Sequence, residues 1–236
     1  MPASDLIQSH YNHKTEDLAY IVIQVAQYIP YSHRSQDKLL KIVQNLMTSD
    51  RFVGTVDLRV PYYGPSGATK GGQIYHCYWD APGQDSGFKA HHYVSFHAFL
   101  ARFVAWQAAT GDSWLLWPLR TLGSRLEPPL RRPDEPLDTV TAGAALLLLY
   151  SGQWLFERVV MFPPASLDDG YVRGISSGEL YSGPVLGLER WRYWRQTLKA
   201  RTEDNQLGSE ARRLALKAVD FMECLERNDP RLERTE

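Results

Sequence analysis

This sequence of 236 residues contains few cysteines and has almost no net charge. The two cysteines, Cys77 and Cys224, are too few for a disulfide-stapled miniprotein. The formal net charge is −1, so the chain lacks the global positive field of a general nucleic-acid binder. Apolar residues make up 44% of the chain, more than a disordered chain contains. We therefore expect one sizeable core and no nucleic acid as a partner.

Targeting and processing signals are also missing. Residues 1–5 lack the basic segment and apolar run of a secretory signal, and no Asn-X-Ser/Thr acceptor occurs in the chain. The two cysteines lie far apart in the sequence, which favours reduced thiols. These absences predict an intracellular, cytoplasmic protein.

One long uncharged run, residues 139–156, is consistent with either a membrane span or a core helix. Its 18 residues barely reach the length that crosses a bilayer. The run contains Thr141 and Gln153, and Asp138 and Glu157 flank it. We interpret it as the buried central helix of the protein and expect no membrane span.

Apolar spacing predicts a mostly helical chain. In the first predicted helix, Ile21, Val22 and Val25 recur at helical spacing, and Pro30 ends the pattern. The predicted helices cover residues 15–29, 35–47, 91–109, 114–126, 139–156, 188–201 and 209–226.

The order of these segments predicts an all-α fold of about seven helices in a single globular domain over residues 1–236. The helical core is expected over 15–227. Two long irregular segments, 50–90 and 161–187, interrupt it because they are rich in turn-forming residues. The charged tail 228–236 is expected to be frayed.

Histidine spacing does not predict a metal site. His91, His92 and His97 are one, five and six residues apart, whereas a helical zinc site favours histidines four residues apart. No acidic residue lies between Asp85 and Asp112. We expect no metal, although a partly buried histidine can act as a general acid or base near neutral pH.

Cofactor motifs are absent as well. The glycine-rich run 64–72 lacks the Gly-Lys-Ser/Thr order of a phosphate loop. No Gly-X-Ser-X-Gly elbow, paired cysteines, dinucleotide fingerprint or kinase motif set is present. We therefore expect no cofactor, and the run 64–72 is interpreted as a turn segment or a lid over a site.

Basic and aromatic residues alternate over 188–195. Trp191, Trp194 and Arg195 share one face of the predicted helix. One interpretation is a tryptophan-rich core face covered by arginine stems. The other is that Arg195 reaches into a pocket and holds an anion.

Aromatic residues are abundant, with 7 Trp, 13 Tyr and 8 Phe. Wide rings with polar tips on central helices can leave an apolar cavity with hydrogen-bond donors, as in small-molecule sites. Ordinary aromatic packing explains the same composition, and both interpretations stay open. The candidate cavity residues are Tyr75, Trp79, His92, Tyr93, Phe96, Phe103, Trp106, Tyr150 and Trp154.

Three segments, taken in order, resemble a known family. They are Arg-Ser-Gln-Asp-Lys-Leu-Leu-Lys-Ile-Val-Gln-Asn-Leu at 34–46, Tyr-Val-Ser-Phe-His-Ala-Phe-Leu-Ala-Arg at 93–102, and 144–156 followed by Glu-Arg-Trp-Arg-Tyr-Trp-Arg at 189–195. Together they resemble the fungal family named domain of unknown function 3632, over roughly residues 35–226. The resemblance implies a helical, soluble fungal protein, and some family members belong to natural-product pathways.

The family implies no settled set of catalytic residues. The third predicted helix also departs from it, because Ser95 and His97 stand where the resemblance leads us to expect asparagine. No residue role is therefore carried over from the family to this chain.

Proteins without cofactors in such pathways can act as cyclases or isomerases. An aromatic cavity that holds one folded conformation of an apolar intermediate lowers the barrier by orientation, and one donor to a carbonyl adds electrostatic help. A pericyclic reaction of the Diels–Alder type needs no proton carrier, metal or nucleophile. We therefore predict a cofactor-independent cyclase or isomerase for an apolar intermediate of fungal natural-product biosynthesis, with His97, Tyr75 and Arg195 as catalytic donors.

Two alternatives to this enzyme stay open. One is a non-catalytic small-molecule binding protein that uses the same cavity without turnover. The other is a helical interaction module, such as a homodimer that pairs through exposed tryptophan residues.

Overall fold

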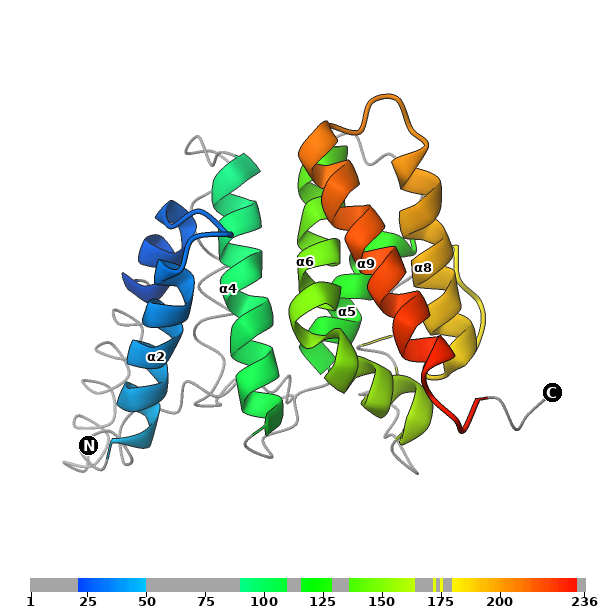
Figure 1. The fold of residues 1–236 in the computed structure, drawn as a ribbon, viewed down its shortest axis with the longest axis horizontal. Helices are drawn as coiled ribbons and strands as arrows, with labels where there is room; N and C mark the ends of the chain where they lie inside the picture. The colour runs from blue at the N-terminus through cyan, green and yellow to red at the C-terminus, as the bar shows by residue number, and fades with distance from the viewer. Residues whose placement is uncertain are drawn as a thin grey trace, which may run out of the picture. The chain divides into compact units, whose positions relative to one another are not determined.

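The computed structural model describes residues 21–49, 90–109, 116–128, 136–163, 172, 175 and 180–232. Within this part of the chain all regular structure is helical, which confirms the all-α prediction. A helical segment at 21–28 comes first (Figure 1). It is followed by α2 (Ser35–Thr48), α4 (Ala90–Ala109), α5 (Leu116–Leu126), α6 (Leu137–Phe156), the π-helix η1 (Glu157–Met161), α8 (Leu188–Thr202) and α9 (Ser209–Arg227).

The observed helix bounds lie within two residues of the predicted ones wherever the structure describes both ends, with one exception. The central helix does not end at Phe156 but continues through η1 into a segment that was predicted to be irregular from residue 161. The predicted segment 50–90 lies almost wholly outside the described residues.

The chain divides into two compact units, Met1–Phe99 and Leu100–Glu236. The boundary lies inside α4, which is continuous from Ala90 to Ala109. The prediction of a single domain over residues 1–236 stays a prediction.

In the first unit, one glutamine joins three helical segments. Gln36 on α2 is fully buried, and its amide nitrogen lies 3.1 Å from the Ala26 carbonyl oxygen and 2.7 Å from that of Ile29. The same nitrogen lies 3.2 Å from the Ser95 carbonyl oxygen on α4. The last carbonyl groups of a helix have no partner within the helix, so Gln36 supplies donors where the segment 21–28 ends before Pro30.

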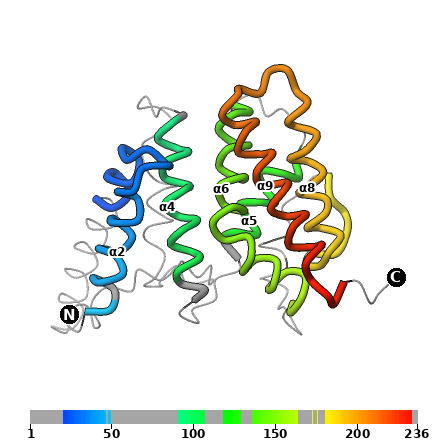
Figure 2. The backbone as a smooth tube through the Cα atoms, in the orientation of Figure 1, coloured from blue at the N-terminus to red at the C-terminus, as the bar shows by residue number. Residues whose placement is uncertain are grey.

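In the second unit, α6 and α9 run parallel and pack closely (Figure 2). At their starts, Asp138 Oδ1 accepts a hydrogen bond of 2.7 Å from the backbone N–H of Gly208. Further along both helices, a Cβ atom placed on Gly152 would lie 2.9 Å from the Phe221 ring. The two contacts are separated by a similar number of residues on each helix, so the two helices run in the same direction.

Helix α8 runs antiparallel to α9. The Arg212 guanidinium, near the start of α9, donates to the carbonyl oxygens of Thr202, Asp204 and Leu207 at and after the end of α8. At the other end, Arg195 on α8 donates to Glu226. A cation at the carbonyl end of α8 also complements the helix dipole.

The continuous helical run Leu137–Met161 is long and apolar enough to cross a membrane by length and composition. However, 72% of its most apolar window is buried inside the protein. Fourteen residues of α6 are buried, from Thr139 to Phe156. Burial of this kind is typical of the core helix of a soluble protein.

Candidate functional site

His97 lies in an aromatic cluster on the first half of α4. Only 2% of this residue is exposed, and its ring stacks on Tyr93, with ring centroids 3.8 Å apart. Phe96 meets the imidazole edge-on at 6.1 Å. Tyr93 and His97 are four residues apart, so the helix itself brings them together.

The backbone determines which nitrogen of His97 carries the proton. The Nδ1 atom lies 3.0 Å from the Tyr93 carbonyl oxygen. A carbonyl oxygen can only accept, so Nδ1 carries a hydrogen, and Nε2 holds the lone pair whenever the ring is neutral. A neutral ring would accept a proton at Nε2, and a protonated ring would donate one, which is the role predicted for His97.

The half-buried His92 belongs to the same unit. Its ring lies 4.5 Å from the Tyr28 ring on the segment 21–28 and 4.2 Å from the His91 ring. The first half of α4 therefore gathers four of the predicted site residues. They are His92, Tyr93, Phe96 and His97.

The second half of α4 holds Phe103 and Trp106, whose ring centroids are 5.7 Å apart. The sequence reasoning missed Arg102 beside them. Its guanidinium donates to the Tyr150 hydroxyl oxygen on α6 at 2.6 Å, and the guanidinium carbon lies 3.8 Å from the centre of that ring. Trp154, one helical turn after Tyr150, is half-buried. Tyr150, one of the predicted residues of α6, thus contacts a cation that no motif had indicated.

Arg195 was predicted to hold an anion in a pocket, and in the structure it pairs with Glu226 of this chain. The Arg195 guanidinium lies 2.8 Å from one carboxylate oxygen of Glu226, and the Arg192 guanidinium lies 2.8 Å from the other. Trp191 and Trp194 on the same helix are fully buried, as a core face requires.

Tyr75 and Trp79, also predicted at the site, lie outside the described residues. Among the residues that the structure does describe, no group of three or more histidine, cysteine, aspartate or glutamate residues could hold a metal ion.

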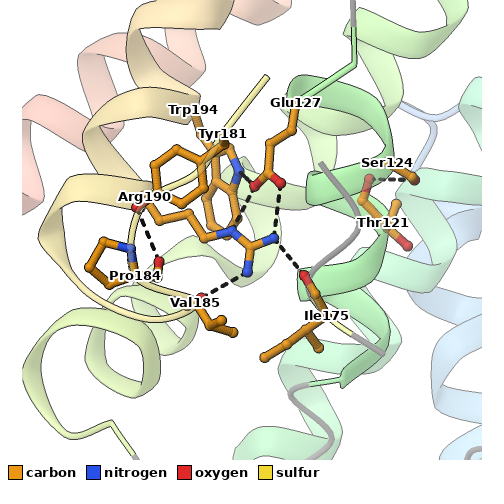
Figure 3. A network of polar contacts seen from close by, with 9 residues as sticks. All are labelled: Thr121, Ser124, Glu127, Ile175, Tyr181, Pro184, Val185, Arg190 and Trp194. Atoms are coloured by element: carbon orange, nitrogen blue, oxygen red, sulfur yellow. Dashed lines mark hydrogen bonds and ion pairs between the residues drawn. The ribbon is translucent and has the colours of Figure 1, made fainter. Parts of the chain in front are cut away.

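A second cluster that sequence reasoning missed is a buried ion pair between Glu127 and Arg190 (Figure 3). Both side chains are 1% exposed. Arg190 Nε lies 2.6 Å from Glu127 Oε1, and Nη2 lies 3.1 Å from Oε2, which is the bidentate geometry of strong arginine–carboxylate pairs. The indole N–H of Trp194 donates to Glu127 Oε1 at 2.7 Å.

The remaining donors of Arg190 hold the chain that precedes α8. Nη1 donates to the Val185 carbonyl and Nη2 to the Ile175 carbonyl, both at 2.7 Å (Figure 3). The Glu127 carbonyl accepts a bond of 2.9 Å from the backbone N–H of Leu180. Glu127 and Arg190 therefore fix three points of the segment 175–187, and this closed network is a structural anchor.

Tyr181 lies at the edge of this network. Its hydroxyl donates to the Pro184 carbonyl at 3.1 Å, and its ring lies 5.1 Å from that of Tyr193. Burial, and next the negative charge of Glu189, raise the pKa of the Tyr181 phenol above its ordinary value. The sequence offered little signal for this cluster, because Glu127 begins a proline-rich stretch and lies 63 residues from Arg190.

Comparison with known proteins identifies the family of this chain. No curated protein and no solved structure matches the chain. The family model described as "Protein of unknown function (DUF3632)" matches residues 20–198, a range that includes α4, α6, Glu127 and Arg190. The match covers more than half of the chain, so this protein belongs to the family of domain of unknown function 3632.

Proposed function

We propose that this protein is a cofactor-independent isomerase or cyclase that acts on an apolar intermediate of a natural-product pathway in the cytoplasm. The observation that carries the proposal is the state of His97. It is a nearly buried imidazole between aromatic rings, with Nδ1–H bonded to a backbone carbonyl and Nε2 as its basic nitrogen.

This arrangement suits proton transfer. An imidazole nitrogen that holds a lone pair can take a proton next to a carbonyl and return it elsewhere. The Tyr93 and Phe96 rings that pack around it are themselves buried, so the surroundings of His97 are apolar. A proton-transfer isomerisation or cyclisation would use His97 directly, whereas a pericyclic reaction would use only the shape of the aromatic surface.

Deuterium exchange tests this proposal without knowledge of the natural substrate. The protein is incubated in buffered D₂O with 2-tetralone, an apolar aromatic ketone, and loss of the α-proton signals is followed by NMR. We expect exchange about tenfold faster than in buffer alone and a return to the buffer rate in His97→Phe, because the basic nitrogen is gone. The matched control is His91→Phe, an exposed histidine of the same helix.

Two outcomes would contradict the proposal. One is a wild-type exchange rate equal to that of buffer, and the other is an unchanged rate in a folded His97→Phe protein. Saturable binding of 2-tetralone with no exchange above buffer would instead favour the non-catalytic binding protein.

One observation favours a second candidate, a homodimer. Ile21, Val25 and Tyr28 are 59%, 41% and 69% exposed and lie on one face of the segment 21–28. An apolar stripe of this kind is typical of a helix that packs against another helix. Light scattering should show a dimer that Val25→Glu converts to a monomer, whereas Gln24→Glu, an exposed neighbour, leaves it intact. A monomeric wild-type protein would rule this candidate out.

A further inference from the structure

One face of α2 presents positive charge to solvent. Arg34, directly before the helix, and Lys38 and Lys41 within it are all exposed. Their spacing of four and three residues places them on one face, which we call the basic ridge. Among the described residues, none of these three side chains forms an ion pair, whereas the exposed Arg213 of α9 pairs with Glu210.

Positive charge also exceeds negative charge around the ridge. Asp37, the one acidic residue of α2, lies beside the ridge, three residues from Arg34 and four from Lys41. The segment 21–28 contains no charged residue, and the first half of α4 contains no acidic residue, lysine or arginine. Three cations and one carboxylate leave an excess of two positive charges here, although the formal net charge of the whole chain is −1.

An exposed isoleucine flanks the ridge. Ile42 is 56% exposed and follows Lys38 by one helical turn. A turn of about 100° per residue places Ile42 and Asp37 on opposite sides of the ridge. An apolar side chain beside several cations suits a bilayer of anionic lipids, which has negative headgroups over an apolar interior. A nucleic acid fits less well, because α2 carries no aromatic residue on which a base could stack.

We propose that the basic ridge and Ile42 form a peripheral docking surface for an anionic lipid membrane. The three cations are attracted to the headgroups, and Ile42 enters the boundary between headgroups and acyl chains. The docking is peripheral, so α2 keeps its buried face packed against the protein. The inference does not depend on the proposed function, because none of these residues belongs to the aromatic cluster around His97.

Cosedimentation of the full-length protein with lipid vesicles tests this surface. One set of vesicles contains phosphatidylcholine alone, and the other contains equal parts of phosphatidylcholine and phosphatidylserine. At low ionic strength we expect binding to the anionic vesicles to be about tenfold tighter, because each cation near an anionic surface strengthens binding about fivefold and Asp37 opposes it. High salt should abolish the difference, because it screens exposed charges.

Variants locate the surface on the protein. Lys38→Gln/Lys41→Gln should weaken binding to the anionic vesicles about tenfold, because it removes two cations of the ridge. The matched control is Lys199→Gln/Lys217→Gln, which removes the same charge from exposed positions on α8 and α9 and should bind like the wild type. Ile42→Ser should weaken binding about threefold and leave its salt dependence unchanged, because it removes insertion and no charge. Circular dichroism confirms that each variant is folded.

The proposal fails if the wild-type protein binds both kinds of vesicle equally or binds neither. It also fails if the ridge variant and the matched control lose the same affinity, since that result would indicate general attraction between the protein and the anionic surface. A DNA duplex that binds the ridge as tightly as the anionic vesicles do would overturn the assignment to a membrane.

Discussion

Arg190 shows at the residue scale how a charge can be buried in this protein. Four hydrogen bonds use its guanidinium, two to Glu127 and two to the backbone carbonyls of Ile175 and Val185. The Trp194 indole also donates to Glu127. Desolvation of two charges is costly, so such a pair is tolerated only when nearly every polar atom has a partner.

Removal of one member of this pair should therefore be strongly destabilising. We expect Arg190→Met to lower the free energy of unfolding by about 3–5 kcal/mol, because Glu127 would remain buried without its counter-charge. Urea unfolding measures the change. The control is Arg213→Ala, which breaks the exposed pair with Glu210 and should leave the urea midpoint nearly unchanged. A similar small effect in both variants would contradict the anchor role.

Tyr181 gives a prediction for alkaline pH. Its folded pKa is raised above the ordinary value of 10.0, mainly by burial, so the folded protein holds the phenol proton more tightly than the unfolded chain does. The resulting stability is present below pH 10.0 and is lost as pH rises through the folded pKa. Unfolding free energies measured at increasing alkaline pH should fall less steeply in Tyr181→Phe than in the wild type. If the unfolding free energy falls equally steeply in both proteins, the Tyr181 phenol does not contribute to the alkaline loss of stability.

At the element scale, the close approach of α6 and α9 depends on a residue without a side chain. Gly152 faces Phe221, and an added Cβ would lie only 2.9 Å from that ring. Alanine is intrinsically better than glycine in a helix by about 1 kcal/mol. Overpacking of a helix interface costs about 1–3 kcal/mol, so the clash is expected to outweigh the gain.

We expect Gly152→Ala to lower the melting temperature, and Gly152→Ala/Phe221→Leu to recover part of the loss, because the smaller side chain makes room for the methyl group. Thermal unfolding of both single variants and the double variant completes the cycle. Additive effects would show that Gly152 and Phe221 do not constrain each other.

At the scale of the whole molecule, the protein buries a helical run that is apolar enough to cross a bilayer. The run Leu137–Met161 lies against other helices, with 72% of its most apolar window buried. Because its apolar surface is already covered, we expect the protein to stay in the aqueous phase of a Triton X-114 partition. Recovery in the detergent phase would show that this run contacts lipid instead.

Much of the helix pattern was accessible from sequence, because helical periodicity is a local property of the chain. Apolar residues recur every three or four positions along α2 and α9, and their predicted bounds agree with the structure to one residue. The extension of α6 through η1 was not predicted, because the charged residues Glu157 and Arg158 interrupt the apolar pattern.

The candidate site was less predictable. The Tyr93–His97 contact follows from a spacing of four residues within one helix, so the sequence could indicate it. Arg102 contacts a residue 48 positions away, and no local pattern indicates which cation will meet which ring. Arg195 was expected to face a ligand, but α9 presents Glu226 to it.

The helical character of this chain and the bounds of most of its helices could be read from the sequence alone. Helix formation depends on residues a few positions apart in the chain, because the spacing of apolar residues and the helix ends are local features. The partners of Arg102, Arg190 and Arg195 emerged only from the folded arrangement, because each guanidinium contacts a group from another element. Which groups meet depends on how the helices pack, and that packing is a property of the whole core.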